Sequence, residues 1–297
     1  MPQSPVIFDR RLLRMRRARA EKLGLSTFLV ERIADDMAER LGTVLRRFDL
    51  AVDLGTPGDA VRLALAASGK VGTVVTMDAL AAGGNSFAVA ADEEALPLRE
   101  GAIDLVVSAL ALHAVNDLPG TLVQIRRALR PDGLLLAALF GGDTLTELRL
   151  AFAEAEAEIE DGASPRVAPF ADLRDLGALL QRAGFALPVA DVERLTVRYA
   201  SPLALMHELR RMGATNALAE RLRTPLRRAT LLRMMEIYGE RFSDADGRIR
   251  ATFEIVWLSG WAPHESQQQP LRPGSARQRL ADALGTKEQS AGEKPGR

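Results

Sequence analysis

The sequence predicts an α/β protein with a doubly wound sheet of seven mostly parallel strands. An apolar run ends in an acid and a glycine-containing turn within residues 51–60, and a helix-forming segment follows directly. Strand-like and helix-like segments then alternate as far as residue 140, which is typical of a parallel sheet covered by helices. A late alternating run at residues 249–261 predicts a last, antiparallel strand, with helices inserted before it.

The composition indicates a large apolar core and no net charge. Of 297 residues 47% are hydrophobic, and 39 Lys and Arg balance 39 Asp and Glu. This balance gives no electrostatic reason to expect a nucleic-acid or membrane partner. The absence of cysteine excludes disulfides, thiolate metal sites and a cysteine nucleophile. No apolar run reaches the roughly 18 residues that predict a transmembrane segment.

Two helices are predicted before the first strand, and we expect residues 1–47 to form a helical cap beside the pocket. Residues 8–23 are basic, which indicates either a solvated helix face or a patch for an acidic partner. Their arginines are Arg10, Arg11, Arg14, Arg16, Arg17 and Arg19. The second helix runs from about 26 to 47, with Ser26 as its N-cap and a buried stripe at helical spacing. That stripe contains Leu29, Ile33, Met37 and Leu41.

Acidic residues follow three successive strand candidates. The runs that predict strands end near residues 53, 77, 91, 112 and 140, and helices are predicted at 60–67 and 118–129. Asp53, Asp78 and Asp92 stand at or just after the first three carboxyl ends. One such acid usually forms a turn or caps a helix. Because these ends line one crevice in an open parallel sheet, three in succession predict a ligand site.

The first of these acids is followed by two glycines, Gly55 and Gly58. The backbone N–H groups of this turn lie at a helix start, where they can bind an anionic group. A dinucleotide-binding fingerprint needs Gly-x-Gly-x-x-Gly, which is absent here. A nicotinamide-dependent dehydrogenase is therefore the least favoured class of enzyme.

The second half of the chain is predicted to support the site and to form the substrate surface. Residues 144–159 form a helix with an acidic face, and the Gly/Pro loop at 161–169 is a candidate lid or hinge. Further helices are expected at 172–182, 202–212 and 225–241, and strands at 187–199 and 249–261. Polar, Gly- and Pro-rich residues predict a flexible tail at 263–297. The domain between cap and tail would span 48–262.

Several motifs together resemble class I S-adenosylmethionine-dependent methyltransferases over roughly residues 48–141. They are Val-Asp-Leu-Gly at 52–55, the acid at 78, the segment 91–98, Ile-Asp-Leu-Val-Val-Ser at 103–108 and Leu-Arg-Pro-Asp-Gly at 129–133. The resemblance implies that S-adenosylmethionine is the cofactor. Its methionine end would lie at Asp53 and the glycine turn, its ribose at Asp78 and its adenine at Asp92 and Glu93. Its binding residues would be Asp53, Gly55, Gly58, Asp78, Asp92, Glu93 and Ser108.

A narrower resemblance is to the methyltransferase-fold assembly factors of respiratory complex I and their bacterial relatives. It is carried by Phe-Asp-Arg at 8–10, Leu-His-Ala-Val-Asn-Asp-Leu at 112–118, Phe-Gly-Gly-Asp-Thr-Leu at 140–145 and His-Glu-Ser at 264–266. It implies modification of an arginine in a complex I iron–sulfur subunit, by hydroxylation or by methylation. It also implies the cytoplasm of a bacterium or the mitochondrial matrix of a eukaryote. The chain departs from the family pattern at Pro57, Asp59 and Ala114.

Two residues are candidates for catalysis. Asp143 could pair with a substrate guanidinium, or it could cap the following helix. His113 follows the fourth strand and could line the pocket, His207 reads as structural, and His264 lies in a family motif. No histidine spacing predicts a facial iron triad, so no metal site is expected. The alternative to an enzyme is a complex I assembly chaperone with a degenerate ligand pocket.

Overall fold

A computed structural model describes residues 6–80, 87–160, 162–268 and 285–286. By its contacts the chain divides into two compact units, Met1–Pro263 and His264–Arg297. The first unit holds every helix and strand described below. Most of the predicted tail at 263–297 lies outside the described residues, and the predicted division into cap, domain and tail stays a prediction. None of the described helices is long and apolar enough to cross a membrane.

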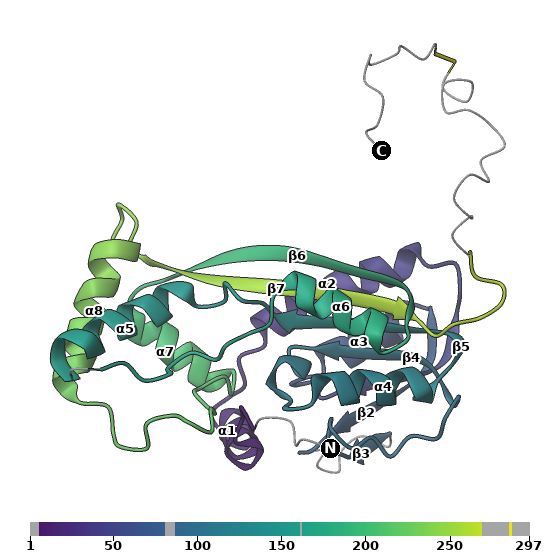
Figure 1. Cartoon of the computed structure of the whole chain (residues 1–297), viewed down its shortest axis with the longest axis horizontal. Coiled ribbons are helices and arrows are strands. Elements are labelled where there is room, and N and C mark those ends of the chain that lie inside the picture. Colours follow the sequence, from purple (N-terminus) through teal and green to yellow (C-terminus); the bar gives the residue numbers. More distant parts are fainter. Residues whose placement is uncertain (1–5, 81–86, 161, 269–284, 287–297) are drawn as a thin grey trace, which may run out of the picture. The chain divides into compact units, whose positions relative to one another are not determined.

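The first unit is built on a seven-stranded sheet of order β3-β2-β1-β4-β5-β7-β6 (Figure 1). Its strands are β1 (Phe48–Leu54), β2 (Val71–Asp78), β3 (Ala88–Ala90), β4 (Ile103–Ala109), β5 (Leu129–Phe140), β6 (Ala186–Tyr199) and β7 (Ile249–Trp261). Strands β1 to β5 pair in parallel, and β7 pairs antiparallel with both β5 and β6. The predicted fold class and the antiparallel last strand are confirmed.

The order of the strands reverses between β1 and β4, which pair directly. In doubly wound sheets the crevice at such a reversal, beside the carboxyl ends of the strands, is where ligands bind. The short β3 pairs with the end of β2 and brings the acids that follow it to the same edge. The topology therefore gathers the predicted acids at one end of the sheet.

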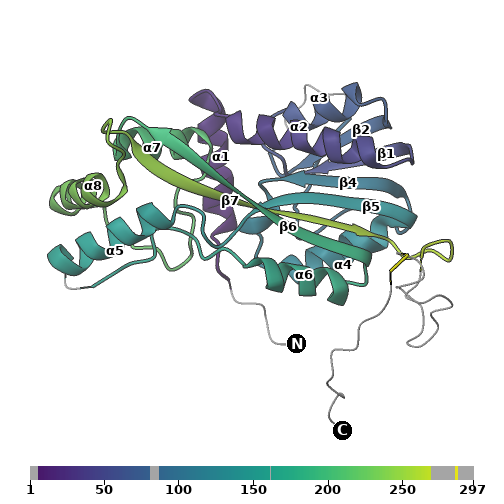
Figure 2. The same ribbon diagram turned by 90° about the horizontal axis from the view of Figure 1, so that it is seen from above.

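Helices cover both faces of the sheet (Figure 2). They are α1 (Arg10–Lys22), α2 (Phe28–Thr43), α3 (Ala60–Ala67), α4 (Leu118–Ala128), α5 (Thr146–Glu160), α6 (Leu173–Arg182), α7 (Pro202–Arg211) and α8 (Arg228–Phe242), with a short 3₁₀ helix at Leu112–Ala114. Helices α2 and α3 share one buried cluster with Leu105 and Val107 of β4, whereas α4 and α6 share the other with Val106. This alternation is the period of two that a strand buried on both faces requires.

The predicted second helix was wrong at both ends. Its N-cap is Thr27, not Ser26, whose hydroxyl instead donates to Glu208 of α7. It ends at Thr43 because Val44 is extended and begins the approach to β1. The predicted stripe is buried, since Leu29, Ile33, Met37 and Leu41 are each at most 2% exposed.

Helices α5, α7 and α8 form a lobe at one end of the long β6–β7 pair (Figures 1 and 2). Helices α7 and α8 lie between β6 and β7 in the chain, as predicted for the inserted helices. Helix α1 lies between this lobe and the sheet, and it contacts both. Arg16 donates to the Asn216 carbonyl on the lobe side, while Arg10 binds Glu93 on the sheet side.

Candidate functional site

Asp53 is buried near the carboxyl end of β1. It is 2% exposed, and its carboxylate accepts a hydrogen bond from the Thr56 hydroxyl. Burial raises the pKa of Asp53 to about 7, because desolvation disfavours the charged form more than the Thr56 hydrogen bond favours it. A cationic ligand group beside this carboxylate would favour its ionised form.

The two glycines after Asp53 have left-handed backbones, with φ of +69° at Gly55 and +76° at Gly58. A side chain at residue 55 would also collide with its surroundings, since a Cβ there would lie 2.8 Å from Glu93 Oε1. Glu93 is therefore folded tightly over the turn. These two positions require glycine for backbone reasons, whatever ligand the turn binds.

A polar cleft of about 640 Å³ opens beside this turn. Among its lining residues are Arg17, Asp53, Thr56, Gly58, Asp59 and Asp78. Three predicted cofactor-binding residues, Asp53, Gly58 and Asp78, thus share one cleft. Ser108 lies apart from it: its hydroxyl is buried and donates to the Leu54 carbonyl at 2.7 Å, which ties β4 to β1.

The remaining predicted acids bind arginines of α1. Arg10 pairs with Glu93 and, at 3.0 Å, with Asp92, and Arg14 also pairs with Asp92. Arg17 lies 3.3 Å from Asp78 and 3.5 Å from Glu93. These three arginines share one face of α1, because residues four and seven apart are aligned on a helix.

The sequence interpretation of the basic helix missed this arrangement. Its alternatives were a solvated face and a patch for an acidic partner, yet half of the six arginines neutralise acids of the same chain. Arg11 and Arg19 are exposed as a solvated face predicts.

The pKa values of the paired acids depend on their surroundings. Burial raises the pKa of Asp78 despite Arg17, whereas at Asp92 the Glu94 N–H and Arg10 outweigh burial and lower the pKa.

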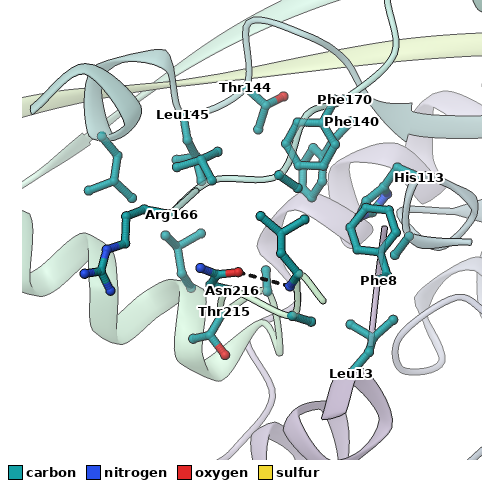
Figure 3. A pocket seen from close by; sticks show the side chains of 18 of the residues that line it. Phe8, Leu13, His113, Phe140, Thr144, Leu145, Arg166, Phe170, Thr215 and Asn216 are labelled. Carbon is teal, nitrogen blue, oxygen red and sulfur yellow. Dashed lines mark hydrogen bonds between the residues drawn. The ribbon is translucent and has the colours of Figure 1, made fainter. Parts of the chain in front are cut away.

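An apolar chamber of about 250 Å³ lies at the ends of β4 and β5, under the N-terminal residues and against the lobe (Figure 3). His113 lines it, with ring centroids 4.7 Å from Phe140 and 5.5 Å from Phe170. Burial and the nearby Arg17 lower the pKa of His113 to about 3, so the imidazole is neutral at physiological pH. Ala114, one departure from the family pattern, also lines the chamber.

Asp143 does not share the chamber with His113. Its side chain is 52% exposed and pairs with Arg194 of β6, whose Nε also binds Glu254 at 3.0 Å. The structure therefore does not bring the two catalytic candidates together, and a guanidinium of this chain already binds Asp143. His207 is exposed on α7, and in the second unit His264 Nδ1 lies 2.7 Å from the Ser266 hydroxyl.

Comparison with known proteins gives the family. The family model described as a methyltransferase domain matches residues 52–137. The chain is 40% identical over 286 residues to a human protein named arginine-hydroxylase NDUFAF5, mitochondrial, covering 93% of this chain and 82% of that one. The chain belongs to the arginine-hydroxylase NDUFAF5 family. A zebrafish member is 38% identical over 291 residues, covering 93% of this chain and 89% of its own length.

The NDUFAF5 match confirms the narrower resemblance that the motifs at 8–10, 112–118, 140–145 and 264–266 predicted. The aligned region covers 93% of this chain, whereas the methyltransferase domain model matches residues 52–137. The similarity to NDUFAF5 therefore includes residues outside that domain. Among solved structures, the YcgJ protein of Bacillus subtilis has a TM-score of 0.50 with 14% identity, covering 76% of this chain and 97% of that one. That likeness shows the fold alone.

Proposed function

We propose that this chain binds S-adenosylmethionine in the polar cleft and modifies an arginine of a protein substrate during assembly of respiratory complex I. Membership of the NDUFAF5 family carries the proposal, since the human and zebrafish relatives are named arginine-hydroxylases. The narrower resemblance described above implies an iron–sulfur subunit of complex I as the substrate. We propose the bacterial cytoplasm, or in a eukaryote the mitochondrial matrix, as the place of the reaction; the human relative is named mitochondrial.

The residues of the cleft suit the polar groups of this cofactor. Asp53 would face the ammonium group and Asp78 the ribose hydroxyls, both of which are donors that carboxylates accept. The N–H groups of the turn at the start of α3 would face the cofactor carboxylate. Bound S-adenosylmethionine would supply a methyl group on a positively charged sulfur. The chain's own part is to bind and orient it.

A non-catalytic assembly chaperone is the second candidate, and one observation favours it. Arg17 occupies the Asp78 carboxylate, and Pro57 removes an N–H from the turn. A cleft in which Asp78 pairs with Arg17 and Asp59 with Arg62 fits a protein that has lost its ligand and kept its partner surface. The two candidates differ in whether the arginine is chemically changed.

Mass spectrometry of the complex I iron–sulfur subunit tests this difference. In cells without this protein we expect complex I to be lost and the target arginine to be unmodified. The wild-type chain should restore both. A gain of one methylene on the arginine identifies methylation, and a gain of one oxygen identifies hydroxylation. Restored complex I with an unmodified arginine would instead support the chaperone.

Replacing Asp78 by alanine is expected to weaken S-adenosylmethionine binding roughly 10- to 100-fold, because hydrogen bonds to a charged group contribute about 1.5–3 kcal/mol. Calorimetric titration measures this change. Asp35→Ala is the control, since Asp35 is an exposed aspartate on α2. Equal affinity of the Asp78 variant and wild type, with an intact fold, would remove Asp78 from the ribose site.

Restoring glycine at Pro57 and Asp59 is expected to strengthen S-adenosylmethionine binding about tenfold, because the returned N–H can bind the cofactor carboxylate. The charge of Asp59 contributes less, since its carboxylate is 65% exposed and lies 3.0 Å from Arg62. The double variant should also be less stable, by about 0.4–1 kcal/mol per glycine. Unchanged or weaker binding would show that the turn does not contact this ligand.

A further inference from the structure

We propose that the chamber beside His113 binds an uncharged aromatic or branched aliphatic group that carries one hydrogen-bonding atom. The chamber is separate from the polar cleft, and the lining residues of the two have no member in common. Its walls come from the N-terminal residues, the end of β4, the end of β5 and the lobe. The chamber would bind such a group whether or not the cleft binds S-adenosylmethionine.

Most polar side chains in the chamber wall already have partners within the chain. The Thr144 hydroxyl donates to the Glu254 carbonyl at 3.0 Å and accepts from the Glu254 N–H at 3.1 Å. Asn216 donates to the Pro165 carbonyl at 2.7 Å and accepts from the Leu218 N–H at 3.0 Å. These groups offer little to a ligand, so the rest of the wall selects for apolar surface.

The one charged group of the wall is neutralised in place. Arg166 Nε donates to Glu156 at 2.6 Å, and Glu156 is 1% exposed. The Ser164 hydroxyl and N–H also donate to this carboxylate, at 2.8 and 2.6 Å. The Arg166–Glu156 pair therefore presents no free charge of either sign to the chamber.

Two described wall residues, His113 and Arg166, have a buried nitrogen without a hydrogen-bond partner, and of these only Arg166 Nη2 lies within ion-pair distance of a carboxylate, that of Glu156. Within the described part of the chain neither ring nitrogen of His113 has a hydrogen-bond partner, and Nδ1 is buried. Buried polar atoms in native proteins nearly always have a partner, which a bound group or a water molecule can supply. The imidazole contacts the rings of Phe140 and Phe170, and Phe8 lines the same chamber (Figure 3). One polar atom on an otherwise apolar group matches this wall.

The size and charge of the chamber decide against the substrate's arginine as its occupant. A cavity of roughly 150 Å³ holds benzene, so about 250 Å³ accommodates a bicyclic ring or a branched side chain. A guanidinium would find aromatic faces but no free carboxylate among the described lining residues. The attraction of aromatic faces is smaller than the cost of burying an unpaired charge.

Binding of three matched bicyclic probes tests the proposal. Indole carries a donor, 1-indanone carries an acceptor and indane carries neither. By ligand-observed NMR on the full chain we expect all three to bind, and either indole or 1-indanone to bind roughly three- to tenfold more tightly than indane. Benzylguanidinium should bind at least about tenfold more weakly than indane. No binding by any neutral probe, or tighter binding of the guanidinium, would overturn the proposal.

Two variants locate the probes in the chamber. His113→Phe keeps an aromatic ring and removes both nitrogens, so it should abolish the preference over indane while indane itself still binds. Ala114→Phe should fill the chamber and reduce binding of all the neutral probes. His207→Phe makes the same chemical change on the exposed face of α7 and should leave probe binding as in wild type. A preference over indane that survives in His113→Phe would overturn the role of His113.

The group can belong to a small molecule or to a side chain of a protein, and two peptides distinguish these sources. One contains Phe two residues from an Arg, and the other has Ala in place of the Phe. Displacement of indole by the Phe peptide alone would assign the chamber to a substrate side chain. Displacement by neither peptide would assign it to a small molecule. Equal displacement by both peptides would mean that the arginine enters, which overturns the proposal.

Discussion

Replacing Asp53 by asparagine is expected to make the ligand-free protein more stable than wild type at neutral pH. The pKa of Asp53 is raised from 3.8 to about 7 by burial, so the folded state holds a proton that the unfolded chain releases. The stability due to this proton is complete below about pH 4 and is lost as pH rises to 7. Each unit between the two pKa values corresponds to ~1.4 kcal/mol, which gives a loss of about 4 kcal/mol.

Urea unfolding of both proteins from pH 4 to pH 8 measures this effect. The difference in unfolding free energy, Asp53→Asn minus wild type, should rise between pH 4 and 7 and then level off. Asparagine still offers an oxygen to Thr56, so the local hydrogen bond can persist. A difference that does not change with pH would mean that Asp53 is ionised in the folded protein. Binding of a cationic ligand to wild type near pH 6 should release a proton, and the variant should release none.

Replacing Arg10 by methionine is expected to destabilise the protein by about 3–5 kcal/mol, the usual cost of removing one partner of a buried ion pair. Glu93 is 2% exposed and Arg10 is 13% exposed, so water cannot replace the lost charge without a rearrangement. Thermal and urea unfolding measure the change. Arg11→Met is the matched control, because Arg11 is the neighbouring, exposed arginine of α1.

A double variant separates charge from packing at this position. Among the described residues only Arg17, at 3.5 Å, still compensates the Glu93 carboxylate in Arg10→Met, so adding Glu93→Gln should recover much of the lost stability. If the double variant is as unstable as the single one, the lost contribution is the packing of the Arg10 stem and its hydrogen bond to the Ala114 carbonyl. A single variant as stable as Arg11→Met would show that Glu93 reaches solvent or another cation.

Much of the fold could be predicted because each element carries its own periodic pattern. The alternating run of β7 predicted an antiparallel last strand. The acids at the carboxyl ends of successive strands predicted that Asp53 and Asp78 lie in one cleft. Local patterns say nothing about partners far away in the sequence. Arg10, Arg14 and Arg17 stood at helical spacing beside only one acid within their helix, Glu21. Unpaired arginines on one helix face, together with unpaired acids at strand ends, were a usable signal for the pairing.

The chamber was beyond sequence reasoning for a different reason. Phe8, His113, Phe140 and Phe170 come from segments with no pattern in common, and the pairing of β4 with β5 accounts only for the closeness of His113 and Phe140. Asp143 likewise forms an ion pair with Arg194 of β6, and the position of β6 beside β7 was not predicted. From its position after β4, His113 was predicted only as a candidate for lining a pocket.

The position of β7 sets the order in which the chain can complete its fold during synthesis. It is the last of the described strands to be synthesised, yet it lies between β5 and β6 in the sheet. In the described part of the chain β7 is the one strand that pairs with β6. The backbone N–H and C=O groups of β6 therefore have no strand partner until residues 249–261 are synthesised. A chain that stops before residue 249 therefore exposes edges on both β5 and β6, which are templates for aggregation. Chains truncated before residue 249 are therefore expected to aggregate rather than to fold.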